Sequence, residues 1–401
     1  MNCRICSGYT RTIIDLGISP PANSLLDNTR QSVCSYPLVL EYCNSCCNIQ
    51  LRDCLDSRDL YKNYLYVTPD SKMLNEHYEY LTRFLLSNKY INSDSKVLEI
   101  GSNIGLYLNH IRPFVKEILG VDPAENIAKL ANAKGVHTIC EFFSKELAMD
   151  LRNSKGKVDT IIARHCFAHN ASPHDLLKGV KVLLDEGGVF VIENAYALNT
   201  IENNEFDQIY HEHMFYYSIQ SMTKVLEMNG FKLIDILISL VHGGSIVFIA
   251  KHISSKNSIS NSLRTHLQYE KEKLNMNTLA RFSSNAFTLK EDLLKTINAI
   301  NQRKETIYSY GATAKGNTLL NFLGLDNSII KYCVDSTSIK QGKYLPGSKI
   351  KIINEDFKDV ERPDYFLLTA WNYKDEIITK VRNKGNKDSA FIVPFPTLHI
   401  I

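Results

Sequence analysis

The chain has 401 residues, enough for two or three domains, and its 44% hydrophobic and 22% charged residues are those of an ordinary globular protein. Its formal net charge of +3 is too small to indicate a nucleic-acid partner, and it has no apolar run of membrane length. The first residues, MNCRICSGYT, lack the apolar core of an export signal. We therefore expect a cytoplasmic protein that binds neither nucleic acid nor membrane.

Residues 1–70 contain most of the ten cysteines and are expected to form a zinc-binding domain. Cys3-x-x-Cys6 and Cys43-x-x-Cys46 each present two thiolates to one ion, and together they complete a tetrahedral shell. Four thiolates leave no open coordination position, so this zinc is expected to be structural. Two unrelated buried thiol pairs are the alternative, and three other cysteines lie close enough in sequence to substitute: Cys34, Cys47 and Cys54.

Residues 71–252 alternate between strand-like and helix-like segments. The apolar stretches are VLEIG, ILGVD, DTIIA and GVFVIEN, and each precedes a more polar, periodic stretch. This alternation predicts a Rossmann-like parallel sheet with helices on its faces. In residues 253–401, a polar connecting helix is expected up to about residue 300, and the alternation then restarts with TIYSYGATAKGNTLLNFLG. The overall prediction is an α/β fold with a zinc-binding domain, a central Rossmann-like domain and a second, smaller C-terminal one.

The stretch VLEIGSNIGLYL, residues 97–108, predicts a ligand-binding turn. A buried strand is expected to end at Glu99, and Gly101 and Gly105 let the backbone approach a ligand at the start of a helix. The next strand ends in Asp122, at a position that commonly binds ribose hydroxyls. The dinucleotide fingerprint G-x-G-x-x-G is absent, so the turn suits S-adenosylmethionine better than NAD. A ligand-free connection between strand and helix is the alternative.

The stretch FDQIYHEHMFYYS, residues 206–218, places Tyr210, His211, Glu212 and His213 in succession. H-E-H is not H-E-x-x-H, so the zinc face of a metalloprotease helix is not predicted. In an extended strand the two histidines share one face, whereas in a helical turn Tyr210 and His213 form an i,i+3 pair. Either arrangement gives an imidazole a hydroxyl or a carboxylate within reach. A packed aromatic segment is the alternative.

Further turns indicate close approach of the backbone to a ligand. They are VHGGS at 241–245 and SYGATAKGN at 309–317. Lys315 would offer its charge to a phosphate at a helix start, although the P-loop motif is missing; the alternative is a solvated lysine. Trp371 and Asn372 follow an apolar strand, where open α/β sheets bind ligands, and for Trp371 packing is the alternative.

Several sequence blocks occur in a characteristic order over nearly the whole chain. They are YPLVLEYCNSC, LEIGSNIG, FAHN, FDQIYHEH, VHGGS, YGATAKGNTLLNF, VDSTSIKQGKYLPG and AWN. Together they resemble the sugar C-methyltransferases of deoxysugar biosynthesis, a family that includes the C-3 methyltransferase of the tetronitrose pathway. The resemblance implies methyl transfer from S-adenosylmethionine to C-3 of a nucleotide-linked 4-keto-6-deoxy sugar, with dTDP or GDP as the nucleotide.

Carbon is a poor nucleophile, so a proton beside the ketone must leave first, and the enolate oxygen then needs donors. Because the pKa of histidine lies near neutrality, we assign His213 as the general base, with Tyr210 as donor to the C-4 oxygen or as an alternative base. The other catalytic candidates are Glu212, which would orient His213 or contact the sugar, His169 as a second donor to the enolate, and Tyr66, with Tyr64 as an equally placed competitor.

The resemblance also implies ligand sets. The cofactor set is Glu99, Gly101, Ser102, Asn103, Gly105 and Asp122. The substrate set is His242, Gly243, Gly244, Tyr310, Lys315, Asn317, Trp371 and Asn372. The zinc ligands are Cys3, Cys6, Cys43 and Cys46.

The sequence departs from the family at three places. At the first, Cys47 follows Cys46 where the family often has glycine. The turn Ser102–Gly105 lacks the usual aspartate, and Arg164 and His165 replace small or amide residues, so the adenine pocket is expected to differ. O- or N-methylation of a related sugar nucleotide is the alternative activity, and an inactive relative is another. A zinc-ribbon protein that binds nucleic acid is disfavoured because arginines and acidic residues balance in residues 1–54. The oligomeric state is open, with a monomer expected.

Overall fold

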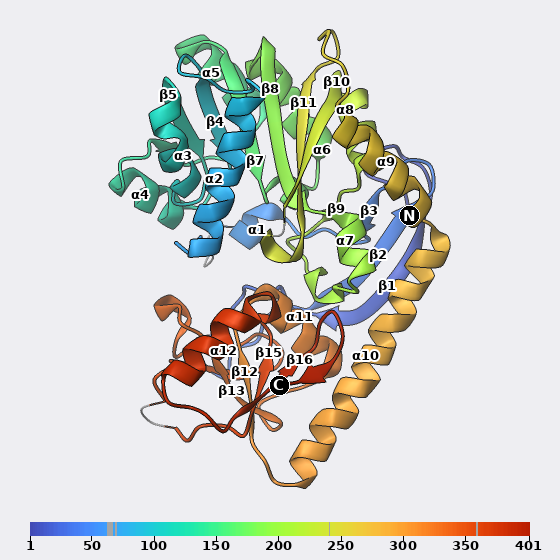
Figure 1. The fold of residues 1–401 in the computed structure, drawn as a ribbon, viewed down its shortest axis with the longest axis vertical. Coiled ribbons are helices and arrows are strands. Elements are labelled where there is room, and N and C mark those ends of the chain that lie inside the picture. Colours follow the sequence, from blue (N-terminus) through green and yellow to red (C-terminus); the bar gives the residue numbers. More distant parts are fainter. Residues whose placement is uncertain (62–66, 69, 240, 358–359) are drawn as a thin grey trace.

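The computed structural model describes residues 1–61, 67–68, 70–239, 241–357 and 360–401. Within these residues the chain forms three sheets, connected by helices that cover them (Figure 1). The expected α/β class, with a cysteine-rich N-terminal part and two successive Rossmann-like sheets, is confirmed.

The N-terminal sheet has four antiparallel strands in the order β1-β2-β3-β9. The strands are β1 (Thr10–Ser19), β2 (Tyr36–Cys43), β3 (Ile49–Leu51) and β9 (Phe215–Tyr216), and the short helix α1 (Ser57–Tyr61) follows β3. Strand β9 comes from far along the chain and pairs Tyr216 with Ile49. The segment that contains Tyr210 and His213 is therefore attached to the cysteine-rich sheet, a long-range pairing that the sequence does not indicate.

The central sheet has seven strands in the order β10-β11-β8-β7-β4-β5-β6. Its strands are β4 (Lys96–Ile100), β5 (Glu117–Val121), β6 (Thr138–Ile139), β7 (Val158–Arg164), β8 (Leu184–Ala195), β10 (Phe231–Ser239) and β11 (Ser245–His252). Strands β4 to β8 are parallel, whereas β10 and β11 form an antiparallel hairpin at one edge. The apolar stretch LIDILIS, residues 233–239, lies in β10.

Helices cover both faces of the central sheet because its strands are apolar on both sides. They are α2 (Lys72–Ser87), α3 (Leu106–Ile111), α4 (Glu125–Ala133), α5 (Lys145–Lys155), α6 (Pro173–Leu183) and α8 (Ile219–Met228). The short helix α7 (Ala197–Glu202) follows β8 and contacts α10 (Met276–Gln302). Consecutive residues of a strand point to opposite faces. Accordingly, Val97 and Ile162 pack with α2 and α3, whereas Leu98 and Ile161 belong to the cluster that contains α5 and α6.

The C-terminal domain is built on a six-stranded sheet in the order β14-β13-β12-β15-β16-β17. Its strands are β12 (Ile307–Tyr310), β13 (Ile330–Val334), β14 (Lys351–Ile353), β15 (Tyr365–Leu368), β16 (Ala390–Val393) and β17 (His399–Ile400), and its helices are α11 (Ala314–Leu323) and α12 (Lys374–Asn383). All neighbouring strands are parallel except β16 and β17.

The connection between the two larger sheets contains two helices where one was expected: α9 (Asn261–Lys273) and α10 (Met276–Gln302). The break lies at Asn275, whose side chain accepts hydrogen bonds from the amides of Asn277 and Thr278 and thereby caps α10. The long helix α10 runs beside β1 and α11, from the central sheet towards the C-terminal one (Figure 1).

Both parallel sheets have a point at which the strand order reverses. The reversal lies between β4 and β7 in the central sheet and between β12 and β15 in the C-terminal sheet. Open α/β sheets bind ligands outside the carboxyl ends of their strands at such points. The fold therefore offers two candidate ligand-binding edges.

Candidate active site

One cavity of about 750 Å³ connects the two edges. Gly101 and Asp122 line it from the central sheet, and Gly311 and Asp335 line it from the C-terminal domain. Its lining also includes three of the five residues expected to be catalytic: His169, Tyr210 and His213. Its volume lies within the range of small-molecule sites.

The glycine turn after β4 lies against the cavity as expected. Gly101 adopts a φ of +65°, and a Cβ there would lie 2.6 Å from the Cβ of Cys166, so only glycine fits without displacement. The amides of Asn103 and Ala124 donate to the two carboxylate oxygens of Asp122 at 2.9 and 3.0 Å. Burial raises the pKa of Asp122, while these two amides oppose the shift. The carboxylate is thus held at the end of β5, beside the cavity.

Two members of the expected cofactor set do not line the cavity. Gly105 precedes α3 and packs against Val136. Glu99 is fully buried and accepts a 2.8 Å hydrogen bond from Nε of Arg164. Ser102 and Asn103, by contrast, are lining residues.

Arg164 forms a buried ion pair with Glu99 and lines the cavity at the end that contains Gly101 and Asp122. Its guanidinium carbon lies 4.3 Å from the ring centroid of Tyr107 and 4.9 Å from that of Tyr78. Burial raises the pKa of Glu99, and the charge of Arg164 opposes that shift. Nearby, His77 pairs with Glu193 at 2.6 Å. The pair of Arg164 and Glu99 is the structural consequence of the arginine that distinguishes the sequence from the family pattern.

Tyr210 and His213 form a hydrogen-bonded pair in a tight turn. The amide of His213 donates to the carbonyl of Tyr210 at 2.9 Å, so the helical-turn arrangement, and not the extended one, is present. The hydroxyl oxygen of Tyr210 lies 2.5 Å from Nε2 of His213, and Nδ1 of His213 lies 3.1 Å from the carbonyl oxygen of Gln208. A carbonyl only accepts, so Nδ1 carries the proton and Nε2 accepts from Tyr210.

Of the histidines that line the cavity, His169 and His213 are held neutral near pH 7. Burial, and then the neighbouring His169, His165 and Lys315, hold the pKa of His213 well below 6.5. Burial and the proximity of His165 lower the pKa of His169 to about 3. The ring centroids of His169 and His213 are 5.2 Å apart. The neutral imidazole of His213 can accept a proton, but a pKa this low makes it a weaker base than the near-neutral histidine expected from the sequence.

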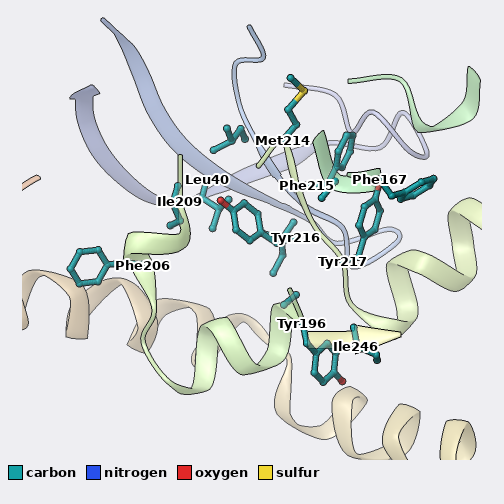
Figure 2. Close-up of a cluster of buried hydrophobic side chains, with 14 of the residues drawn as sticks. Leu40, Phe167, Tyr196, Phe206, Ile209, Met214, Phe215, Tyr216, Tyr217 and Ile246 are labelled. Carbon is teal, nitrogen blue, oxygen red and sulfur yellow. The ribbon is translucent and has the colours of Figure 1, made fainter. Parts of the chain in front are cut away.

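The other apolar and aromatic residues of the FDQIYHEHMFYYS stretch belong to the hydrophobic core. Figure 2 shows Phe206, Ile209, Tyr216 and Tyr217 packed in one cluster with Leu40 of β2. Glu212 is buried outside the cavity and accepts a 2.9 Å hydrogen bond from Asn23. His211 lies against the ring of Tyr36. The stretch is therefore both an aromatic core segment and the carrier of the Tyr210–His213 pair.

On the C-terminal side, Asp335 repeats the arrangement of Asp122. Its two carboxylate oxygens accept from the amides of Ala312 and Thr337 at 2.7 and 2.8 Å, beside the glycine turn that follows β12. Sequence reasoning missed Asp335, although it follows a glycine turn and the next strand just as Asp122 does. It also missed other lining residues that only tertiary contacts reveal: Gln208, Lys340, Glu355 and Lys380.

Some residues of the expected substrate set line the cavity and others do not. Tyr310, Lys315 and Asn372 line the cavity. Gly243 and Gly244 pack against Glu205 and Asn199, Asn317 is buried, and Trp371 donates to Asp207. Tyr64, Tyr66 and the side chain of His242 lie outside the described residues.

The four cysteines of the two knuckles form one cluster. Their sulfur atoms lie within 4.8 Å of one another, with Cys3 to Cys46 at 3.6 Å and Cys6 to Cys43 at 3.5 Å. A tetrahedral zinc with Zn–S bonds of about 2.3 Å separates its sulfurs by about 3.8 Å. The donor set and its dimensions fit a zinc ion, and Cys47, whose sulfur faces Gln220, is outside the cluster.

Comparisons with known proteins agree with this layout. Family models match a zinc binding domain at residues 3–61, a methyltransferase domain at 73–236 and a C-methyltransferase C-terminal domain at 240–396. The C-methyltransferase NovU of Streptomyces niveus is 32% identical over an alignment of 405 residues that covers 100% of this chain and 96% of NovU. The chain belongs to the C-methyltransferase family. This C-methyltransferase is therefore an S-adenosylmethionine-dependent enzyme with a zinc-binding N-terminal domain.

Solved structures are similar to part of the chain. YcgJ of Bacillus subtilis is 15% identical, with 43% of this chain and 99% of YcgJ covered and a TM-score of 0.34. Magnesium protoporphyrin IX methyltransferase of Synechocystis PCC 6803, solved with bound S-adenosylhomocysteine, is also 15% identical, with 44% and 82% covered and a TM-score of 0.34. In the described part of the chain, no helix has the length and apolarity needed to span a membrane.

Proposed function

We propose that this C-methyltransferase methylates C-3 of a 4-keto-6-deoxy sugar linked to dTDP or GDP, through an enolate. The observation that carries the proposal is the Tyr210–His213 pair, which lies in the same cavity as the glycine turns of both Rossmann-like sheets. A cofactor at one end and a nucleotide at the other would place a sugar ring between them, beside the pair. Support also comes from the ordered sequence blocks that resemble the sugar C-methyltransferases.

At the cofactor end, the carboxylate of Asp122 would accept the ribose hydroxyls, and the turn at Gly101 would receive the methionine end. Bound S-adenosylmethionine supplies a methyl group on a sulfonium centre. The residues of the turn fix its position, because in-line transfer requires the methyl carbon close to the reacting C-3. Ser102 and Asn103 line this end of the cavity beside them.

In the middle of the cavity, His213 acts as the general base. The proton on C-3, which the neighbouring ketone acidifies, leaves to the hydroxyl oxygen of Tyr210 as the tyrosine proton passes to Nε2 of His213. The carbonyl of Gln208 holds Nδ1–H and so keeps Nε2 free to receive it. The neutral His169 donates an N–H to the enolate oxygen, since a neutral donor stabilises the oxyanion without giving up its proton.

At the C-terminal end, the cavity carries both lysines and acidic residues: Lys380 pairs with Glu355 at 2.7 Å, and Lys340 lies 3.9 Å from Asp335. We assign the diphosphate to Lys315. Lys315 lies at the start of α11, whose first turn begins at the N-cap Thr313. Lys340 and Lys380 also line this end. A helix N-terminus and ammonium groups together suit a phosphate.

Isotope exchange tests the proposal. The purified protein is incubated in D₂O with S-adenosylhomocysteine and each of several dTDP- and GDP-linked 4-keto-6-deoxy sugars, and exchange at C-3 is followed by NMR. We expect exchange that depends on His213, and methylation of the same compound when S-adenosylmethionine is supplied. Methylation at oxygen or nitrogen without C-3 exchange would assign the alternative activity instead.

A further inference from the structure

The C-terminal domain forms hydrogen bonds to the two residues that flank Gln208 in the sequence, Asp207 and Ile209. Nε1 of Trp371, which lies just after β15, donates to a carboxylate oxygen of Asp207 at 2.7 Å. The hydroxyl of Thr318, on α11, donates to the carbonyl of Ile209 at 3.1 Å. Asp207 is fully buried, and Trp371 is only 9% exposed. Two side chains of the C-terminal domain therefore form hydrogen bonds on either side of residue 208, one to the side chain of Asp207 and one to the backbone of Ile209.

The backbone carbonyl of Gln208, between these two contacts, determines which ring nitrogen of His213 carries the proton. The carbonyl of Gln208 accepts from Nδ1 of His213 at 3.1 Å and from the hydroxyl of Tyr216 at 2.8 Å. If this carbonyl turned away, Nδ1 would lose its acceptor. The proton could then move to Nε2, and the nitrogen that faces Tyr210 would no longer be basic.

We infer that Trp371 and Thr318 are positioning residues for the general base, and that they act by fixing the Gln208 carbonyl that keeps the His213 proton on Nδ1. This inference rests on the proposed role of His213. It assigns to the C-terminal domain a second task besides holding the substrate, because the same domain determines which imidazole nitrogen is free.

Lys315 connects this contact to the ligand-binding end of the cavity. Its ammonium nitrogen lies 4.9 Å from the ring centroid of Trp371, and the residue lines the cavity. An anion bound at Lys315 therefore lies next to the indole that holds Asp207. The groups that face His213 are the imidazoles of His169 and His165, the charge of Lys315, and the hydroxyl of Tyr210.

Kinetics provide the first test. Trp371→Phe removes the indole N–H but keeps a ring, and Thr318→Val removes the hydroxyl at nearly constant volume. We expect each variant to lower kcat about 10-fold or more, with KM for the sugar nucleotide and Kd for S-adenosylhomocysteine within about 2-fold of the wild type. Asp207→Asn keeps an acceptor for the indole and should retain most of the activity, whereas Asp207→Ala should behave like Trp371→Phe. An unchanged kcat, or a change confined to KM, in Trp371→Phe would overturn the inference.

A packing control separates positioning from stability. Phe395 packs on Trp371 with ring centroids 5.3 Å apart, and Phe395→Leu perturbs the same cluster without touching the hydrogen bond. We expect this variant to lower Tm but to keep kcat. A loss of kcat in Phe395→Leu as large as in Trp371→Phe would show that general packing explains the effect and would overturn the inference.

NMR tests the inference without any substrate. With ¹⁵N-labelled histidine, the ring-nitrogen shifts of His213 should show the Nδ1–H tautomer in the wild type and a mixture in the Trp371→Phe/Thr318→Val variant. An unchanged tautomer in the double variant would overturn the inference. Because this result needs no turnover, it can stand even where the C-3 exchange experiment fails. Trp371 is also the sole tryptophan of the chain, so its emission should change on addition of dTDP or GDP; constant emission with both would argue against the link through Lys315.

Discussion

The hydroxyl of Tyr210 and Nε2 of His213 are 2.5 Å apart, and the tyrosine is the donor because the other imidazole nitrogen donates to a backbone carbonyl. The pair is thus set to pass a proton from the cavity to the histidine. Its distance is at the short end for an O–H···N bond, as expected for two groups held in one turn. Three consequences for catalysis follow from this pair and its surroundings, and two concern the structure that supports it.

Removal of His213 should abolish turnover while cofactor binding survives. His213→Ala is expected to lower kcat by about 10²–10⁴-fold, the usual contribution of a general base, and Tyr210→Phe by a smaller factor. Kd for S-adenosylhomocysteine, measured by calorimetry, should stay close to the wild-type value, since the glycine turn and Asp122 are untouched. His211→Phe, which changes the neighbouring imidazole outside the cavity, is the matched control. Normal turnover of His213→Ala would remove the residue from the mechanism.

The fall of kcat/KM in acid should occur well below pH 6.5. Burial holds the pKa of His213 well below 6.5 and that of His169 at about 3, so both stay neutral as the pH falls through 6.5, and kcat/KM should stay level there. Stability behaves differently. As the pH falls below about 6.5, these two histidines take up protons in the unfolded chain but not in the folded chain. The free energy of unfolding should therefore be unaffected by them above pH 6.5 and should decrease below it.

The measurements are kcat/KM between pH 5 and pH 8, and Tm over the same range. His169→Gln should weaken the fall of Tm in acid, whereas His266→Gln, on α9 and away from the cavity, should leave it unchanged. A kinetic limb centred near pH 6.5 would show that the base titrates as an ordinary exposed histidine.

Local spacing in the sequence was enough to predict several parts of the site. The two cysteine knuckles and the glycine turn at Gly101 each depend on residues close in the chain. For Tyr210 and His213, the spacing left an extended strand and a helical turn open, and the structure has the turn. Other parts depend on residues far apart in the chain, which no short motif can indicate. They are the contact of Trp371 with Asp207 and the pairing of β9 with β3. Glu212 illustrates the same limit, because its neighbour in space is Asn23 and not His213.

Zinc should support catalysis although it lies outside the cavity. The guanidinium of Arg4, between Cys3 and Cys6, donates to the carbonyl of Leu51 at 2.6 Å and to that of Met214, next to His213, at 3.3 Å. Loss of the ion should therefore release the segment that carries the base. Structural zinc contributes on the order of 10 kcal/mol to small domains, so its loss should unfold the N-terminal sheet.

Cys3→Ser combined with Cys6→Ser is expected to give unstable, zinc-poor protein with little turnover. Metal content, Tm and the affinity for S-adenosylhomocysteine are measured together, and the affinity should fall less than kcat. Cys47→Ser, a neighbouring thiol outside the cluster, should keep the zinc. If the double variant retained one zinc per chain, the ligand assignment would be wrong.

The buried pair of Arg164 and Glu99 should show strong coupling. Arg164→Met removes one partner and leaves a buried carboxylate without its cation, which typically costs about 3 kcal/mol or more. Adding Glu99→Gln removes that charge, so the double variant should recover much of the loss. The free energy of unfolding of the wild type, both single variants and the double variant gives the coupling energy directly. Additive effects would mean that the two side chains do not form the pair seen at 2.8 Å.

Lys315 should affect both substrate affinity and the basicity of His213. Lys315→Met removes a charge from the diphosphate end of the cavity, and we expect KM for the sugar nucleotide to rise about 10-fold or more. The positive charge of Lys315 also helps to lower the pKa of His213, so its removal should raise that pKa and move the acid limb of kcat to higher pH.

Lys290 offers a matched control for this substitution. Its ammonium nitrogen lies 4.4 Å from the ring centroid of Phe322, much as Lys315 lies over Trp371, but it does not line the cavity. Lys290→Met should therefore change neither KM nor the pH profile. A rise in KM without any displacement of the acid limb in Lys315→Met would assign the lysine to phosphate binding alone. If the acid limb of the kcat profile moved while KM stayed unchanged, Lys315 would act on His213 and the diphosphate would bind elsewhere.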